Sequence, residues 1–280
     1  MTVTLTLLGT GSSGGVPRVG NDWGLCDPNE PRNKRSRCAL LVEKAGENGC
    51  TTVLIDAGPD IREQLNSANV THVDAVLFTH AHADHLHGID DLRGFWVKTH
   101  NKVPVFMDAP TFERAQTAFG YCFKTPPGSN YPPILKHHLI DQGSKIEIDG
   151  AGGKICFDAF EVVHGEINAL GFKTEGAAYI PDVSDIPDRS LKYLENLDLL
   201  ILDCLRRRPH PSHICLDEAL EWTKRLSPEK AIFTNLFSDL DYNTLRAELP
   251  DGIVPAYDGM QVDLVENSAK SVFSPYAEQA

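Results

Sequence analysis

Four of the chain's 11 histidines lie within the eight residues 80–87, directly after the apolar run 73–79. A strand that opens into a loop of small residues can direct several side chains to one spot. His80 and His82 are two residues apart, so an extended backbone places them on the same side. Asp84 and His85 lie at the start of the following helix, which directs their side chains to a neighbouring position. Imidazoles and carboxylates bind zinc, manganese or iron. The spacing therefore predicts a metal centre at a strand end, in preference to a loop of solvated histidines.

The hydrophobic pattern predicts strands in both halves of the chain, interrupted by helices. The predicted strands are 2–8, 38–43, 52–56, 73–79, 103–107, 154–163, 169–174, 177–181, 198–203, 230–234 and 260–265. The predicted helices are 60–67, 86–97, 111–119, 188–196, 214–226 and 241–248. Asn48-Gly49 indicates a hairpin. Runs of strands with intervening helices favour two sheets with helices packed outside over strict alternation of strand and helix.

A chain of 280 residues favours one large domain, which we place at 1–265 with a C-terminal tail at 266–280. Two long segments, 9–37 and 120–133, lack regular patterns. Loops of this length inside a compact domain are often functional. For 120–133, the sequence supports a binding loop and a surface loop without a binding role equally.

Acidic residues outnumber basic ones by 39 to 26, which gives a formal charge of −13. Such a surface repels long nucleic acids, so none is expected as a partner. No apolar run is long enough to span a membrane, and the first residues do not read as a secretory signal. The seven scattered cysteines are an odd number, which fits reduced thiols and a cytoplasmic location.

His80, His82, Asp84 and His85 form an HxHxDH motif, and the chain thereby resembles the metallo-β-lactamase superfamily. The resemblance implies an α/β fold, a four-layer αββα sandwich with metals at one edge of the paired sheets. His164, which ends a predicted strand, resembles the family's third-motif histidine. Asp182, which follows another strand, resembles its bridging carboxylate.

The resemblance implies two divalent metal ions as cofactors, zinc or manganese or else iron. His80, His82 and His164 would hold the first ion. Asp84 and His85 would hold the second, with Asp182 between the two. Many relatives place a final histidine near the C-terminus, but the matching stretch here is Thr234-Asn235. The second site is then either weak, completed by His213, or completed by water, Asn235 or substrate.

Further segments resemble the PhnP-like cyclic phosphodiesterases and the related tRNase Z enzymes. They are the glycine-rich opening 8–17 and the segments 33–38, 56–60 and 210–213. The opening also satisfies GxGxxG, but loop residues follow it, where a dinucleotide-binding fold requires a helix. The resemblance implies a metal-dependent phosphodiesterase in which a metal-bound hydroxide attacks a small, cyclic or nucleotide phosphodiester.

The resemblance also suggests roles for individual residues. His213 precedes a predicted helix and would contact the phosphate or protonate the leaving oxygen. Asp84 would position the second ion and accept a proton from water. Asn235 is a further candidate for substrate binding. Two basic clusters, 32–37 and 206–208, are expected to be mostly solvated, with Arg37 or Arg206 facing a phosphate.

Three alternatives remain open from the sequence. The same site could hydrolyse an ester, thioester or lactone. Because the terminal histidine is missing, the chain could instead be a non-catalytic nucleotide- or cofactor-binding protein. RNA processing is the third alternative, which the acidic charge disfavours. A small phosphodiester or nucleotide is the expected ligand, and a homodimer is the expected assembly only because dimers are common.

Overall fold

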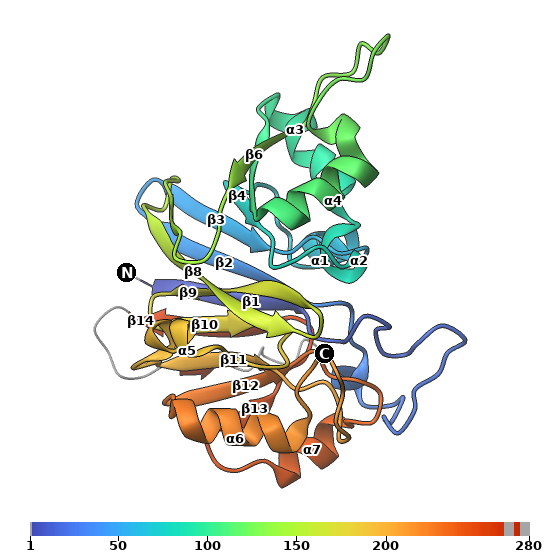
Figure 1. Cartoon of the computed structure of the whole chain (residues 1–280), viewed down its shortest axis with the longest axis vertical. Coiled ribbons are helices and arrows are strands. Elements are labelled where there is room, and N and C mark those ends of the chain that lie inside the picture. The colour runs from blue at the N-terminus through green and yellow to red at the C-terminus, as the bar shows by residue number, and fades with distance from the viewer. Residues whose placement is uncertain (1, 266–271, 275–280) are drawn as a thin grey trace.

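Two β-sheets stack face to face at the centre of the protein, and helices cover their outer faces (Figure 1). The structure is a computed structural model that describes residues 2–265 and 272–274. The four-layer αββα sandwich predicted from the sequence is therefore confirmed.

The first sheet has eight strands in the order β15-β14-β1-β2-β3-β4-β5-β6. Strands β3 to β6 run parallel to one another, so their carboxyl ends meet at one edge. The strands are β1 (Thr2–Gly9), β2 (Ala39–Gly46), β3 (Gly49–Ile55), β4 (Ala75–Leu77), β5 (Val103–Met107), β6 (Leu135–Leu139), β14 (Met260–Val265) and β15 (Val272–Ser274).

The second sheet has seven strands in the order β13-β12-β11-β10-β9-β8-β7. Strands β10 to β13 are parallel, and β7, β8 and β9 continue the sheet as antiparallel neighbours. The strands are β7 (Lys145–Ile148), β8 (Ile155–His164), β9 (Ile167–Thr174), β10 (Ala177–Ile180), β11 (Leu199–Asp203), β12 (Lys230–Thr234) and β13 (Ile253–Pro255).

Three buried clusters hold the layers together. One lies between the sheets and includes Leu5, Val53 and Phe172. A second packs the first sheet against its helices, and a third does the same for the second sheet. The helices are α1 (Ile61–Ser67), α2 (Ala83–Leu86), α3 (Arg93–Thr99), α4 (Ala109–Phe119), α5 (Asp188–Leu191), α6 (Leu216–Leu226) and α7 (Tyr242–Glu248).

Most predicted elements are present, with shifted ends. The predicted helix 86–97 is divided into α2, the 3-10 turn Ile89–Leu92 and α3. Four strands were not predicted from the sequence. They are β6, β7, β13 and β15, which are three to five residues long. Such short strands carry too few alternations to show a period of two. The predicted hairpin at Asn48-Gly49 is correct, because Gly46 pairs with Gly49 between β2 and β3.

The two predicted long loops lie at different places on the molecule. The segment 10–38 contains one 3-10 turn, Pro31–Asn33, and reaches the edge where the parallel strands end. The segment 123–133, between α4 and β6, projects away from the first helical layer (Figure 1). Of the predicted tail, 266–271 and 275–280 lie outside the described residues, whereas 272–274 form β15 beside β14.

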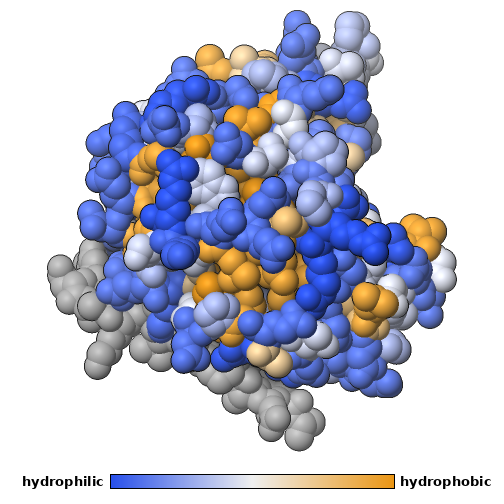
Figure 2. Space-filling view, turned by 60° about the horizontal axis from the view of Figure 1, so that its bottom comes forward, coloured by the Kyte–Doolittle hydropathy of each residue, from blue (hydrophilic) through white to orange (hydrophobic). Residues whose placement is uncertain are grey.

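The visible surface is mostly hydrophilic, and apolar side chains on the face in Figure 2 gather in a hollow near its centre. Among the described residues, no helix combines the length and the apolar composition needed to cross a membrane. All seven cysteines lie in the described part and are free thiols.

Candidate metal centre and active site

The HxHxDH motif lies in the turn between β4 and α2. His82 has an extended backbone and occupies the N-cap of α2, so Asp84 and His85 fall in the first turn of that helix. His80 and His85 are each 1% exposed, whereas the His82 side chain is exposed. The strand-to-helix turn therefore directs both sequential pairs to the carboxyl edge of the first sheet, as the spacing predicted.

The second sheet brings the remaining predicted ligands to the same place. His164 is the last residue of β8, and Asp182 follows β10 by two residues. His164 Nε2 lies 3.1 Å from His82 Nδ1 and 4.0 Å from Asp182 Oδ1. His80, His82 and His164 each offer a ligand atom within 4.8 Å of the others. We refer to these three residues as the imidazole group.

A second set of donors adjoins the first and contains two carboxylates. His85 Nε2 lies 2.9 Å from Asp182 Oδ2 and 3.5 Å from Asp84 Oδ2. His80, His85 and Asp182 also offer atoms within 4.8 Å of one another. We refer to Asp84, His85 and Asp182 as the carboxylate group. The structure thus places all six predicted ligands in one cluster.

Hydrogen bonds at the far ring nitrogens leave a nitrogen of the imidazole group free to bind a cation. The Thr79 hydroxyl donates to Asp56, so His80 Nδ1 donates to Thr79 Oγ1, at 3.0 Å. His164 Nδ1 likewise donates to the Ser212 carbonyl, at 2.6 Å. His80 Nε2 is then buried and has no hydrogen-bond partner within the described part of the chain. Burial lowers the pKa of both imidazoles, which favours the neutral form that binds metals.

Asp56, at the end of β3, links the motif loop to the carboxylate group. It accepts hydrogen bonds from the Thr79 amide at 2.8 Å and from His85 Nδ1 at 2.7 Å. Burial alone would lower the pKa of His85. The charges of Asp182 and Asp56 raise it by more, so the net pKa lies well above its usual value. The two carboxylates thus favour a proton on His85, and a divalent ion beside Asp182 would take the place of this proton and bind the neutral ring.

Asn235 and His213 occupy the position where the sequence lacks a final histidine. Asn235 Nδ2 donates to Asp203 Oδ1 at 3.0 Å and to Asp182 Oδ1 at 3.3 Å. His213 Nδ1 donates to Asp203 Oδ2 at 2.8 Å and lies 3.6 Å from Asp182 Oδ1. His164, Asp182 and His213 form a third set of donors within 4.8 Å. Both residues that the sequence reading considered for this position therefore lie beside the carboxylate group.

A cavity of about 310 Å³ opens beside the ligands. Arg206 lines it, and its guanidinium donates to the carbonyls of Arg208 and Pro209. Arg37 does not line this cavity, because its guanidinium lies 3.2 Å from Asp60 Oδ1. The residues that line it are Ser12, Ser13, His82, Asp84, His164, Asp182, Leu205, Arg206, His210, Ser212, His213 and Phe237.

The sequence reading did not single out Asp56, Asp203 or Ser12 as site residues. Asp56 follows β3, and Asp203 ends β11, so both stand at carboxyl ends of parallel strands. Ligands in open α/β sheets gather at that edge. A search for polar residues at predicted strand ends would have found both aspartates, whereas no local pattern marks Ser12.

The family model described as the β-lactamase superfamily domain matches residues 51–234. That segment contains the motif loop, His164, Asp182 and His213. The chain belongs to the β-lactamase superfamily. A crystal structure of a diphosphatase from the PhnP family is 34% identical, with a TM-score of 0.84, and the match covers 94% of this chain and 97% of that one. The PhnP-like branch predicted from the sequence is therefore also confirmed.

Two curated relatives extend the comparison. An octanoyltransferase of Porphyromonas gingivalis is 29% identical over 98% of this chain and 54% of its own length. A ribonuclease Z of Bradyrhizobium diazoefficiens is 42% identical over 53% of this chain and 47% of its own length. The chain spans about half the length of the curated relatives it matches. The human short-form tRNase Z, 16% identical with a TM-score of 0.64, shares the fold.

The superfamily implies bound divalent metal, and the donors of this domain fit such ions. The fit rests on the unpartnered His80 Nε2 and on the six imidazole and carboxylate donors described above. The domain is a metallo-β-lactamase superfamily hydrolase domain, as the sequence predicted.

Proposed function

We propose that the protein hydrolyses a small phosphodiester, such as a cyclic or nucleotide phosphodiester, with the help of two divalent ions. The observation that carries this proposal is the position of His213, which lines the same cavity as four of the six candidate ligands. A proton donor next to a cation site suits a phosphodiester whose leaving group departs as an alkoxide.

His80, His82 and His164 would hold the first ion, Asp84 and His85 the second, and Asp182 would contact both. Bound zinc or manganese acts as a Lewis acid and lowers the pKa of water toward about 7. Neutral imidazoles with carboxylates suit zinc, manganese or iron, so the donor set does not select one of them. Asn235 places an amide beside the second site, where the sequence lacks the final histidine. The second ion would therefore bind more weakly than the first.

His213 would donate a proton to the leaving oxygen through Nε2, because Asp203 holds its Nδ1. Burial alone would lower the pKa of His213. The hydrogen bond and the charge of Asp203 raise it by more, so the net pKa lies above its usual value. Asp203 thereby favours the protonated ring more than solvent would. Asp84 would orient the second ion and accept the proton of water. Arg206, which forms no ion pair among the described residues, would neutralise charge on the phosphate.

The direct test is turnover of bis(p-nitrophenyl) phosphate, 2′,3′-cyclic nucleotides and a nucleotide diphosphate ester by protein loaded with zinc or manganese. We expect hydrolysis that chelation removes, and a His213→Gln variant that binds metal but turns over slowly. No turnover of any of these compounds, with metal demonstrably bound, would reject the proposal. S-lactoylglutathione and nitrocefin in the same panel test the thioester and lactam alternatives.

The wider expectations belong to this proposal. A net charge of −13 favours a small ligand over a long RNA, so a gel shift with precursor tRNA at modest salt should fail. Seven free thiols fit a reducing cytoplasm. We also propose that residues 1–265 fold as one domain.

A further inference from the structure

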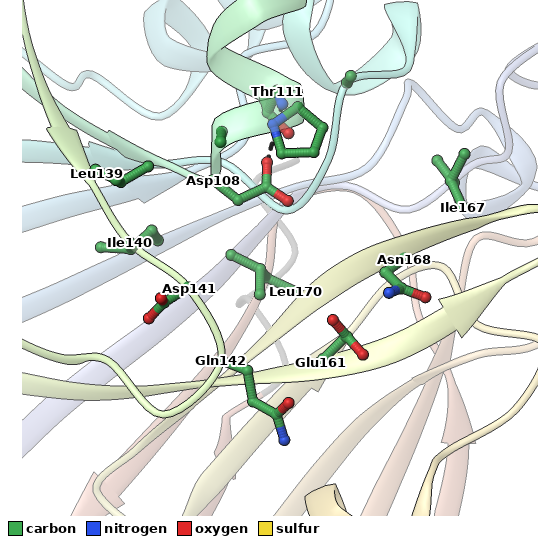
Figure 3. Close-up of a pocket in the computed structure, with 13 residues that line it drawn as sticks. Asp108, Thr111, Leu139, Ile140, Asp141, Gln142, Glu161, Ile167, Asn168 and Leu170 are labelled. Carbon is green, nitrogen blue, oxygen red and sulfur yellow. Dashed lines mark hydrogen bonds between the residues drawn. The ribbon is translucent and has the colours of Figure 1, made fainter.

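A groove near the candidate centre shares no lining residue with the cavity that holds His213. It has a volume of about 490 Å³ and lies between the β8–β9 hairpin and the segment that joins β5 to α4 (Figure 3). Its lining residues are Ala81, Asp108, Ala109, Pro110, Thr111, Leu139, Ile140, Asp141, Gln142, Glu161, Ile167, Asn168 and Leu170.

Two of these residues place the groove close to the candidate centre. Ala81 stands between the candidate ligands His80 and His82 in the motif loop. Ile167 pairs directly with His164 across the β8–β9 hairpin. A molecule that reacts beside the imidazole group therefore has a short path over Ile167 into the groove.

The floor of the groove is apolar and partly open to solvent. Leu139 is 66% exposed and Ile167 is 38% exposed, so both side chains are open to a ligand. Leu170 lies near the centre of the groove, between Asp108 on one side and Glu161 with Asn168 on the other (Figure 3). An apolar body that covers these side chains would gain free energy in proportion to the area removed from water.

The polar groups of the lining are acidic or neutral, and the lining contains no lysine, arginine or histidine. Asp108 accepts the Thr111 amide at the start of α4, and Asp141 accepts the Ser144 hydroxyl. Neither aspartate forms an ion pair among the described residues, whereas Glu161 pairs with Arg189. The groove therefore has a net negative charge, which attracts a cation and repels an anion.

We propose that this groove binds an apolar group bearing a positive charge, such as an alkyl or aryl ammonium group. In the substrate, this group would be the part of the phosphodiester that lies away from the bond that breaks. That second statement rests on the proposed function, whereas binding of the ammonium group itself does not. The groove thus adds a substrate preference that the candidate ligands alone would not impose.

The first experiment measures binding without turnover. Benzyltrimethylammonium and benzenesulfonate, which share a ring and differ in charge, are titrated into the full chain and followed by calorimetry. We expect the ammonium compound to bind at least about 10-fold more tightly, as ~1.4 kcal/mol of charge selection requires. No binding of either compound, or equal binding of both, would overturn the proposal.

Variants then locate the bound probe. Leu139→Lys places a positive charge at the exposed floor and should weaken ammonium binding at least about fivefold. Leu25→Lys is the matched control, because Leu25 is 73% exposed and does not line the groove. Unchanged ammonium affinity in Leu139→Lys, with the variant folded by circular dichroism, would place the probe elsewhere and refute the proposal.

A second experiment connects the groove to the reaction. The choline and ethyl esters of p-nitrophenyl phosphate are compared, and we expect a KM several-fold lower for the choline ester with similar kcat. Leu139→Lys should remove this difference. If neither ester is hydrolysed, the proposed function is rejected. The ammonium titration alone then tests whether the groove binds the charged group. Equal KM values for the two esters would refute the groove as a substrate site.

Discussion

The imidazole group and the carboxylate group adjoin each other, but they differ in charge and in support. His80 and His164 are neutral rings whose far nitrogens donate to oxygen atoms of Thr79 and Ser212. The carboxylate group carries two acidic side chains, with His85 held by Asp56, and its neighbour at the open side is the amide of Asn235. The imidazole group therefore offers the stronger nitrogen ligands for a metal ion. Metal binding at the carboxylate group depends more on the residues that support it.

Removing a ligand of the imidazole group should have the largest effect. We expect His82→Ala to lower phosphodiesterase activity by at least about 1000-fold, because several kcal/mol of charge stabilisation depend on the metal. The measurement is metal content by elemental analysis together with turnover. His87→Ala is the matched control, since His87 is exposed on the same segment and belongs to no donor set. Equal metal content in both variants would contradict the assignment of His82.

Asp56→Asn tests how strongly the carboxylate group depends on its support. The amide keeps the shape of the side chain but cannot accept hydrogen bonds on both atoms from Thr79 and His85. Loss of such a partner typically weakens metal affinity about 10–100-fold. Competition with a chelating dye should therefore show a strong weakening of the equivalent held by His85. The other equivalent should weaken less, because Asp56 reaches its ligand His80 only through Thr79. If both equivalents weaken alike, the two groups are not independent.

Asn235→His should reduce the difference between the two groups. A ring at this position adds a nitrogen donor beside Asp182, and the backbone φ of 60° is one that histidine tolerates. We expect the weaker equivalent to bind about 10-fold more tightly, with the stronger one unchanged. Affinities are compared by the same chelator competition. A variant with unchanged affinity for both would show that His213 already completes the second site.

The fold could be predicted from the sequence where a strand is long enough to show a pattern. Strand β8 alternates along most of its 10 residues, whereas β13 has three residues and no signal of its own. Runs of strands with helices between them predicted two sheets with helices packed outside, and the family resemblance implied the four-layer αββα sandwich. The order of strands in each sheet could not be predicted, because it depends on packing between distant segments.

For the candidate site, the local motif was sufficient to predict a cluster, but the supporting residues were not predictable. His80, His82, Asp84 and His85 are close in sequence, and one turn brings them together. Asp56 is 29 residues from His85, and Asp203 is 32 residues from Asn235, so no local spacing links them. Arg37 and Arg206 looked equivalent in the sequence. Their difference arises from the carboxylate of Asp60 beside Arg37.

The smallest effect on the centre is expected from Asp258, a half-buried aspartate that belongs to neither group. It follows β13 and accepts hydrogen bonds from the amides and hydroxyls of Thr10 and Ser36. Burial raises the pKa of Asp258 to about 6, and these hydrogen bonds oppose the rise only in part. Asp258 therefore serves as a control that should change stability and leave metal content unchanged.

The direction of this effect follows from the two pKa values. Between about pH 4 and pH 6, folded Asp258 keeps its proton while the unfolded carboxyl has lost it, so the free energy of unfolding falls as pH rises. Asp258→Asn cannot ionise. Compared with this variant, the wild-type protein should lose about 2–3 kcal/mol of stability between pH 4 and pH 7, measured by urea unfolding. A constant difference between the two proteins across this range would show that the buried carboxyl is ionised throughout. A change in metal content at pH 7 would show instead that the segment containing Thr10 and Ser36 supports the candidate ligands. Residues outside the two groups would then also determine how tightly the metal binds.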